Sequence, residues 1–156
     1  MKITLFTANQ FRHNYLINLL SDVSKELYVV QENDTLYPGE VQGHYPSSDI
    51  YKNYFSNVLK AQEKLFGKDY ISAKNLKLLS IKEGDINKCS MSFLKDFLKS
   101  DIYIVTGSSF IKGELADFLI EKKALSIHMG LAPYYRGTDC NFWALFDNNP
   151  HLVGAT

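Results

Sequence analysis

The stretch that decides the fold class is MKITLFTANQFRHNYLINLLSDVSKELYVV, residues 1–30. Residues 2–7 are rich in β-forming side chains and end at the polar turn 8–10, which predicts a strand. Apolar side chains then recur at helical spacing, at Tyr15, Leu16, Leu19, Leu20 and Val23. Residues 27–30 form a second short apolar run. A strand, a helix and a strand within about 30 residues make a βαβ-like unit.

The rest of the chain continues this alternation. Further strands are predicted at residues 76–81, 101–105 and 124–128, and residues 151–156 resemble the opening of another. Helices are predicted at residues 51–67, with Asp49 as its cap, and at 90–98, 113–123 and 141–146. We expect the aromatic side chains of the helix at 51–67 to pack in the core. Alternating strands and helices predict an α/β, Rossmann-like fold, with a mostly parallel sheet and helices on both faces.

Composition and charge exclude several classes of protein. Hydrophobic residues make up 46% of the chain and charged residues 22%, which is typical of an ordered globular protein. Positive and negative residues balance at 17 each, so charge indicates no nucleic-acid partner. The N-terminal apolar run is too short for a secretory signal or a membrane span, and we expect a cytoplasmic protein. The two cysteines, Cys89 and Cys140, lack disulfide or metal-ligand spacing, which predicts free thiols and no metal site.

Ligands of parallel α/β sheets bind beyond the carboxyl ends of the strands. Three loops leave such ends, at residues 8–13, 106–113 and 128–141, and we expect them to converge. Residues 31–48 read as a further loop that covers or lines a site. Residues 1–156 contain no internal repeat or linker and are interpreted as one domain. Neither a GxGxxG sequence after the first strand nor a Walker sequence is present.

Residues 126–137, SIHMGLAPYYRG, carry the most specific motif of the chain. The spacing from His128 through Leu131 and Pro133 to Gly137 resembles the signature of the folate-dependent formyltransferases, in which a strand ends in Asn-x-His and runs into a Leu-x-Pro loop. The preceding segment 104–118 and the following residues 141–145 also resemble that family. The resemblance implies a formyltransferase fold and transfer of a formyl group from 10-formyltetrahydrofolate to a small amine, with an amino sugar as the preferred acceptor.

The resemblance also assigns roles to individual residues. His128 would donate a hydrogen bond to the developing oxyanion or transfer a proton, because imidazole exchanges protons near neutral pH. Ser126 stands where the family has Asn, and it would support His128 with a shorter side chain. The folate would be held by the loop formed by Gly107, Ser108, Ser109, Phe110 and Ile111. The alternative for this loop is an ordinary strand-to-helix turn with Ser109 as the cap.

Four residues are candidates for binding the acceptor. Asn9, Arg12 and His13 open a helix, where amides and cations can bind an anionic group, although solvent-exposed helix residues are the stronger interpretation. Arg136 binds a substrate anion or fastens its loop through carbonyl groups, while Tyr134 and Tyr135 are expected to pack the loop. The first turn lacks the glycines that bind the substrate phosphate in the glycinamide enzyme, which argues against purine biosynthesis.

One residue of the family has no counterpart in the sequence. The family's essential Asp follows the strand whose start matches Gly154-Ala155-Thr156, and the sequence ends there. We therefore expect a domain that is incomplete at its C-terminus. The alternative to an enzyme is a non-catalytic binding or scaffold module that kept the formyltransferase shape.

Overall fold

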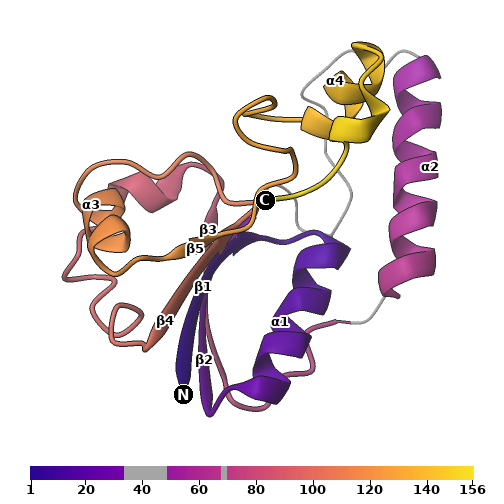
Figure 1. The fold of residues 1–156 in the computed structure, drawn as a ribbon. Coiled ribbons are helices and arrows are strands. Elements are labelled where there is room, and N and C mark those ends of the chain that lie inside the picture. The colour runs from indigo at the N-terminus through magenta and orange to yellow at the C-terminus, as the bar shows by residue number, and fades with distance from the viewer. Residues whose placement is uncertain (34–48, 68–69) are drawn as a thin grey trace.

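Five parallel strands form the centre of the computed structural model, which describes residues 1–33, 49–67 and 70–156 (Figure 1). They are β1 (Lys2–Ala8), β2 (Glu26–Asn33), β3 (Leu76–Lys82), β4 (Ile102–Thr106) and β5 (Leu125–Ser126), in the order β3-β2-β1-β4-β5. The chain thus winds outward from β1 in both directions, which places the topological switch point between β1 and β4. The α/β fold with a parallel sheet, predicted from the sequence, is confirmed.

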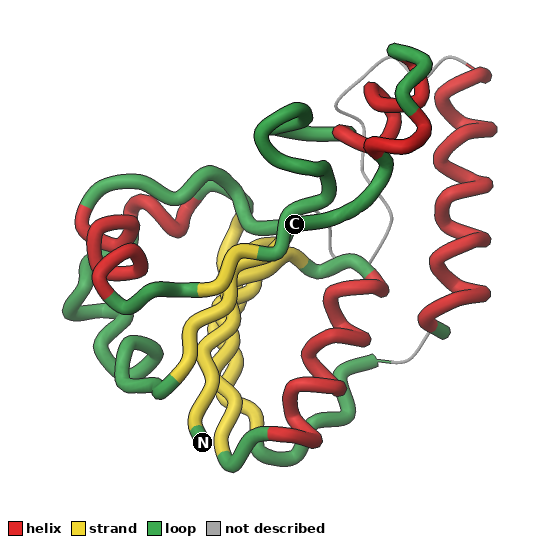
Figure 2. Tube along the Cα trace, in the orientation of Figure 1, coloured by secondary structure: helices red, strands yellow, loops and turns green. Residues whose placement is uncertain are grey.

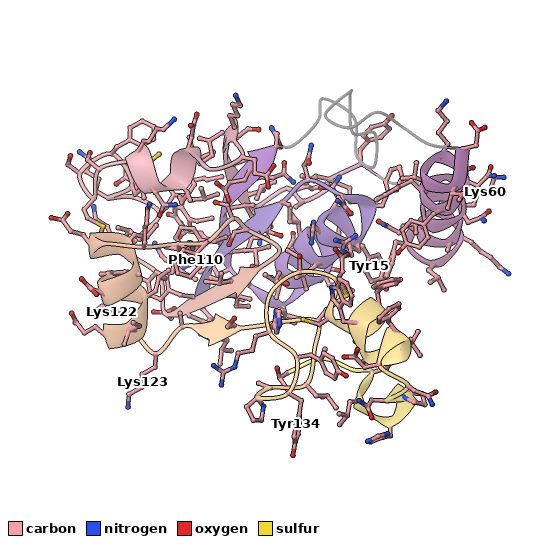
Figure 3. The ribbon with its side chains drawn as sticks, turned by 90° about the horizontal axis from the view of Figure 1, so that it is seen from above. Tyr15, Lys60, Phe110, Lys122, Lys123 and Tyr134 are labelled. Atoms are coloured by element: carbon pink, nitrogen blue, oxygen red, sulfur yellow. The ribbon has the colours of Figure 1, made fainter. Side chains whose placement is uncertain are left out.

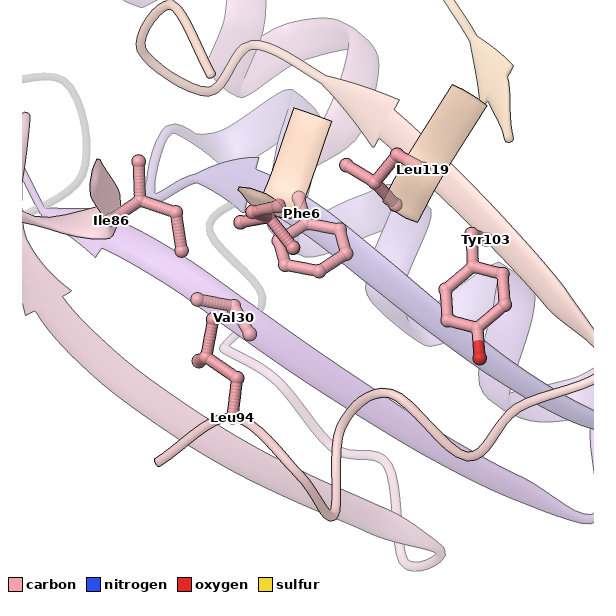
Figure 4. Packing of buried hydrophobic residues seen from close by; sticks show 7 residues of the cluster. Phe6, Val30, Ile86, Leu94, Tyr103 and Leu119 are labelled. Carbon is pink, nitrogen blue, oxygen red and sulfur yellow. The ribbon is translucent and has the colours of Figure 1, made fainter. Parts of the chain in front are cut away.

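The central strands are apolar on both faces because helices cover both sides of the sheet. On one side, α1 (Phe11–Val23) places Ile17 against Leu5 and Val29. On the other side, α3 (Glu114–Glu121), the 3-10 helix η1 (Asp85–Lys88) and the segment 89–100 cover a second cluster (Figure 4). Its buried members are Phe6, Val30, Ile86, Leu94, Tyr103, Leu115 and Leu119. Neighbouring residues such as Val29 and Val30 face opposite clusters, as the twofold alternation of a strand requires.

Residues 90–98 form successive turns instead of the predicted helix. Tertiary hydrogen bonds fasten the end of this segment to the sheet. Thr4 Oγ1 donates to the Phe97 carbonyl (2.6 Å), and Tyr103 Oη donates to the Leu98 carbonyl (2.7 Å). Leu94 is nevertheless fully buried, so the apolar periodicity was real while the helix was wrong.

The helix α2 (Asp49–Phe66) matches the prediction in position but not in burial. Tyr54 is 52% exposed, so the expected core packing is wrong for this aromatic side chain, and the nearby Leu65 is 72% exposed. The helix meets α1 through a ring contact between Phe66 and Tyr15, whose centroids lie 5.6 Å apart. Within the predicted loop 31–48, residues 31–33 belong to β2, and residues 34–48 lie outside the described part of the chain. Among the described helices, none has the length and apolar character needed to cross a membrane.

The strand β5 is shorter than predicted and lies at the exposed edge of the sheet. It spans Leu125–Ser126 rather than 124–128, and Leu125 is 58% exposed. The chain then forms a long loop to α4 (Cys140–Phe146), which was predicted, and the 3-10 helix η2 (Pro150–Leu152) follows (Figure 2). Residues 151–156 form no strand ladder, but Ala155 makes an isolated antiparallel bridge to Met129. This bridge returns the C-terminus to the carboxyl edge of the sheet (Figure 1).

Candidate functional site

The three predicted ligand loops all leave the carboxyl edge of the sheet, which faces the viewer in Figure 3. The first two meet where His13 packs against Gly107. A Cβ atom added to Gly107 would lie 2.4 Å from His13 Nε2, and the residue has a φ of +68°. Only glycine combines this backbone conformation with such a close approach. The third loop begins beside the second, because the Ile127 N–H donates to the Val105 carbonyl (2.9 Å).

His13 is a buried structural group, and its predicted solvent exposure is wrong. It is 5% exposed, and its Nδ1 accepts a hydrogen bond from the Gln10 N–H (3.4 Å) in a capping box at the start of α1. Burial, together with the nearby Arg12 guanidinium, lowers the pKa of His13 from 6.5 to about 4. The imidazole is therefore neutral at physiological pH. Because it carries no charge, it can pack against Gly107 without the cost of removing a charge from water.

The other two candidates at this turn differ in exposure. Asn9 is buried, with 6% of its surface exposed. Arg12 is half-buried, its guanidinium donates to Gln10 Oε1, and burial lowers its pKa. Arg12 is thus a partly desolvated cation at the carboxyl edge, which strengthens its attraction for an anion.

A carboxylate holds the loop after β4. Glu32, at the end of β2, is 2% exposed and accepts hydrogen bonds from the Ser109 N–H (Oε2, 2.7 Å) and the Ser109 hydroxyl (Oε1, 2.9 Å). The Gly84 N–H donates to Glu32 Oε1 as well (2.8 Å). Ser109 is therefore not the cap of α3, as the alternative interpretation of this loop expected; the cap position belongs to Gly113.

Asn87 of η1 holds the same loop from another direction. Its Nδ2 donates to the Phe110 carbonyl (2.8 Å), and its Oδ1 accepts from the Lys112 N–H (2.9 Å). Ser108 and Ile111 are half-buried, whereas the Phe110 side chain is 84% exposed. A hollow of about 390 Å³ lies beside this loop, lined by Ile86, Asn87, Cys89, Met91, Lys112, Gly113, Glu114 and Leu115.

His128 lies just beyond β5 and is fixed through both its backbone and its ring. Its N–H donates to the Thr156 carbonyl (2.7 Å), and its carbonyl accepts from the Thr156 N–H (2.9 Å). The ring Nε2 lies 3.6 Å from Cys140 Sγ, and that thiol also lies 3.4 Å from the Gly137 carbonyl. Cys140 is 3% exposed, so one edge of the imidazole faces a buried thiol. Ser126, two residues earlier, is exposed and ends the edge strand β5.

Tyr135, rather than Arg136, fastens the loop before α4. The Tyr135 hydroxyl donates to Asp147 Oδ2 (3.1 Å) and accepts from Asn149 Nδ2 (3.1 Å). Arg136 is exposed and makes no hydrogen bond or ion pair to any residue the structure describes, so its expected role as a fastener is wrong. The packing predicted for Tyr134 is also wrong, since that side chain is 71% exposed and points away from the domain (Figure 3).

Two residues that shape the site were missed from the sequence. Glu32 was placed in the loop because the apolar run of β2 ends at Val30, and Asn87 belongs to a short 3-10 helix without periodicity. One sequence signal could have identified Glu32. It closely follows a buried apolar run, and polar residues in that position lie at the ligand-binding edge of a parallel sheet. No local signal marks Asn87.

Comparisons with known proteins bear on the fold. No protein-family model and no curated protein matches the sequence. A phosphoribosylglycinamide formyltransferase structure from Anaplasma phagocytophilum matches 94% of the chain with a TM-score of 0.50 and 13% identity. Glycinamide ribonucleotide transformylase 1 from Geobacillus kaustophilus matches 94% of it with a TM-score of 0.52 and 12% identity. The chain spans 58% and 67% of the length of these two proteins. At such low identity the similarity shows the fold and nothing about activity. The chain has the formyltransferase fold.

Proposed function

We propose that this chain carries the donor side of an N-formyltransferase that moves a formyl group from 10-formyltetrahydrofolate to a small amine in the cytoplasm. The observation that supports this most strongly is the position of His128. On a formyltransferase fold, it lies directly beyond β5, and its motif keeps His128, Leu131, Pro133 and Gly137 at the family spacing while Ser126 replaces the Asn. Fold likeness by itself would leave the chemistry open.

The loop at 107–111 would hold the folate donor in this proposal. Gly107 lets the backbone pass close to α1, and Lys112 and Gly113, which follow the loop, line a hollow of about 390 Å³. Ser109 contributes indirectly, because its N–H and hydroxyl are both bound to Glu32. Direct contacts with the donor would come from Ser108, Phe110 and Ile111. When bound, 10-formyltetrahydrofolate supplies an activated formyl group.

His128 would act on the oxygen and the protons of the transfer. The amine nitrogen forms a bond to the formyl carbon, the bond from that carbon to the folate nitrogen breaks, and the proton lost by the amine replaces the formyl group on the folate. A ring N–H of His128 would stabilise the carbonyl oxygen as it gains negative charge, and the imidazole can carry the proton between the two nitrogens. Ser126 would supply a second hydrogen bond from the end of β5.

The preferred acceptor in this proposal is an amino sugar attached to an anionic group. Arg12 is a half-buried cation at the carboxyl edge, and the exposed Arg136 lies on the loop that follows His128. Two guanidinium groups suit a phosphate, which accepts bidentate hydrogen bonds. The turn before α1 has no glycine, so the close backbone cradle for a phosphate in the purine enzyme is not reproduced.

One observation favours the second candidate, a non-catalytic binding module. His128 Nε2 faces the Cys140 thiol, and no carboxylate bonds to the imidazole within the ranges that the structure describes. A histidine without a carboxylate partner is a weaker proton carrier. A module of this kind would bind the folate and release it unchanged.

A formyl-transfer assay separates the two candidates. The full chain is incubated with 10-formyltetrahydrofolate and a panel of nucleotide-linked amino sugars, and formylated product is measured by mass spectrometry. In parallel, binding of 5-formyltetrahydrofolate is followed by Trp143 fluorescence. We expect His128→Ala to keep binding and lose product, and Gly107→Val to lose binding, while the exposed His151→Ala retains both. Binding without product in the wild type supports the module, and absence of both contradicts the proposed function.

A further inference from the structure

A buried thiol holds the ring of His128 at one nitrogen. His128 Nε2 lies 3.6 Å from Cys140 Sγ, and the same sulfur lies 3.4 Å from the Gly137 carbonyl oxygen. Cys140 is 3% exposed, so little water reaches the sulfur to compete with the ring. No other residue in the described part of the chain forms a hydrogen bond with this imidazole. The thiol is therefore the protein group that decides how the ring is oriented.

Cys140 has little room to move away from the ring. It is the first residue of α4, and a Cβ atom added to Gly130 would lie 2.6 Å from Cys140 Cβ and 3.0 Å from its Sγ. The Cys140 side chain thus packs directly on the Gly130 backbone, which only glycine permits at this distance. The start of α4 is fastened as well, because the Gly154 N–H donates to Asn141 Oδ1 (3.0 Å). Rotation of the thiol towards Gly130 is therefore blocked.

The backbone of His128 is held by a different part of the chain. Its N–H and carbonyl both bond to Thr156, at 2.7 and 2.9 Å. Two residues on, the Gly130 N–H donates to the Gly154 carbonyl (2.9 Å), and Thr156 Oγ1 donates to the Gly130 carbonyl (3.0 Å). The backbone is thus fixed by residues 154–156 and the ring by α4. A group held in this way is positioned before a substrate arrives, which is what proton transfer requires.

The donors and acceptors around the thiol decide which ring nitrogen carries the hydrogen. A thiol has one hydrogen, and the Gly137 carbonyl can only accept. The Cys140 thiol donates to that carbonyl, at the shorter of its two distances. Its sulfur is then left to accept from the ring, so Nε2 of His128 carries the hydrogen of the neutral imidazole. The other ring nitrogen, Nδ1, keeps a lone pair that no residue in the described ranges occupies.

We infer that Cys140 is a positioning residue that accepts a hydrogen bond from His128 Nε2 and thereby leaves Nδ1 as the atom that carries the proton. The inference rests on the proposed function and deepens it. As the amine nitrogen bonds to the formyl carbon, its proton moves to Nδ1, and the new Nδ1–H donates to the negative oxygen. The proton then passes to the folate nitrogen as the bond between that nitrogen and the formyl carbon breaks. The hydrogen of the Cys140 thiol stays on its sulfur throughout.

Nitrogen-15 NMR of the full chain without ligand, in mildly alkaline buffer, tests the hydrogen bond independently of activity. The neutral His128 ring should carry its hydrogen on Nε2, and that hydrogen should exchange slowly with water. Cys140→Ala should speed the exchange at least about tenfold, because the acceptor is lost. Cys140→Ser should restore much of the protection, since a hydroxyl can also donate to Gly137 and accept from the ring. The control is Leu145→Ala, an exposed position of the same helix, which should change nothing. A neutral ring with its hydrogen on Nδ1, or exchange that Cys140→Ala leaves unchanged, overturns the inference.

Formyl-transfer kinetics test the consequence for catalysis. Cys140→Ala should lower kcat about tenfold, a part of the roughly 10²–10⁴-fold that a positioned acid or base contributes, with KM within about twofold. Cys140→Ser should recover most of the wild-type kcat, and Leu145→Ala should match the wild type. Equal kcat for the wild type and Cys140→Ala overturns the positioning role and spares the proposed function. No transfer by the wild type contradicts the proposed function and overturns the proton-carrying role with it, whatever the NMR signal shows.

Discussion

Gly107→Ala is the substitution for which the structure gives the clearest expected cost. The added methyl group would lie 2.4 Å from His13 Nε2 and 2.7 Å from its Cε1, and position 107 has a φ of +68°. The left-handed backbone costs a non-glycine residue roughly 1–2 kcal/mol. Overpacking against a buried ring adds about 1–3 kcal/mol. We therefore expect the free energy of unfolding to fall by about 2–5 kcal/mol, a large share of the stability of a small domain.

Urea unfolding followed by circular dichroism measures this loss, with Gly84→Ala as the control. Gly84 has a φ of +82° and no atom within 4 Å of an added Cβ, so it isolates the backbone cost. A double-mutant cycle with His13→Ala then isolates the clash, and the double variant should lose at least about 1 kcal/mol less than the two single changes together. Equal costs at the two glycines, or strict additivity with His13→Ala, would refute the contact between the first two loops.

Three further predictions follow from the pKa shifts and the buried hydrogen bonds. The pKa of His13 is lowered from 6.5 to about 4, so the unfolded state binds the proton first. Stability is complete above pH 6.5 and is lost as pH falls toward 4, by on the order of 3 kcal/mol, and urea unfolding of wild type and His13→Asn across this range should differ in slope. Tyr103→Phe removes two hydrogen bonds to backbone groups and should lower the free energy of unfolding by about 1–3 kcal/mol, whereas Tyr134→Phe, on an exposed side chain, should leave it unchanged in the same assay. Native protein should react slowly with a thiol reagent at pH 8, since Cys140 is buried and burial raises the pKa of Cys89; fast labelling of both before urea is added would contradict this.

The order of strands and helices could be predicted from the sequence because it depends on local periodicity. β1, β2 and α1 are amphipathic or apolar over several consecutive residues, and the parallel sheet follows from their alternation. The motif at 126–137 also predicted His128 at the end of a strand, although β5 ends two residues earlier, at Ser126. Local patterns failed at 90–98, where the chain buries Leu94 through successive turns, and at α2, where a helix of the right length exposes Tyr54.

The contacts that shape the candidate site were decided only by the tertiary structure. Burial of His13, its fit against Gly107, and the bonds from Glu32 to Ser109 join residues that lie far apart in the sequence. The sequence by itself determined the order of the elements and which loops leave the carboxyl edge, because both follow from the alternation of strands and helices. Which of them bond to each other depends on strand order and loop path, and the order β3-β2-β1-β4-β5 brings Glu32 and Ser109 together from strands that are not neighbours.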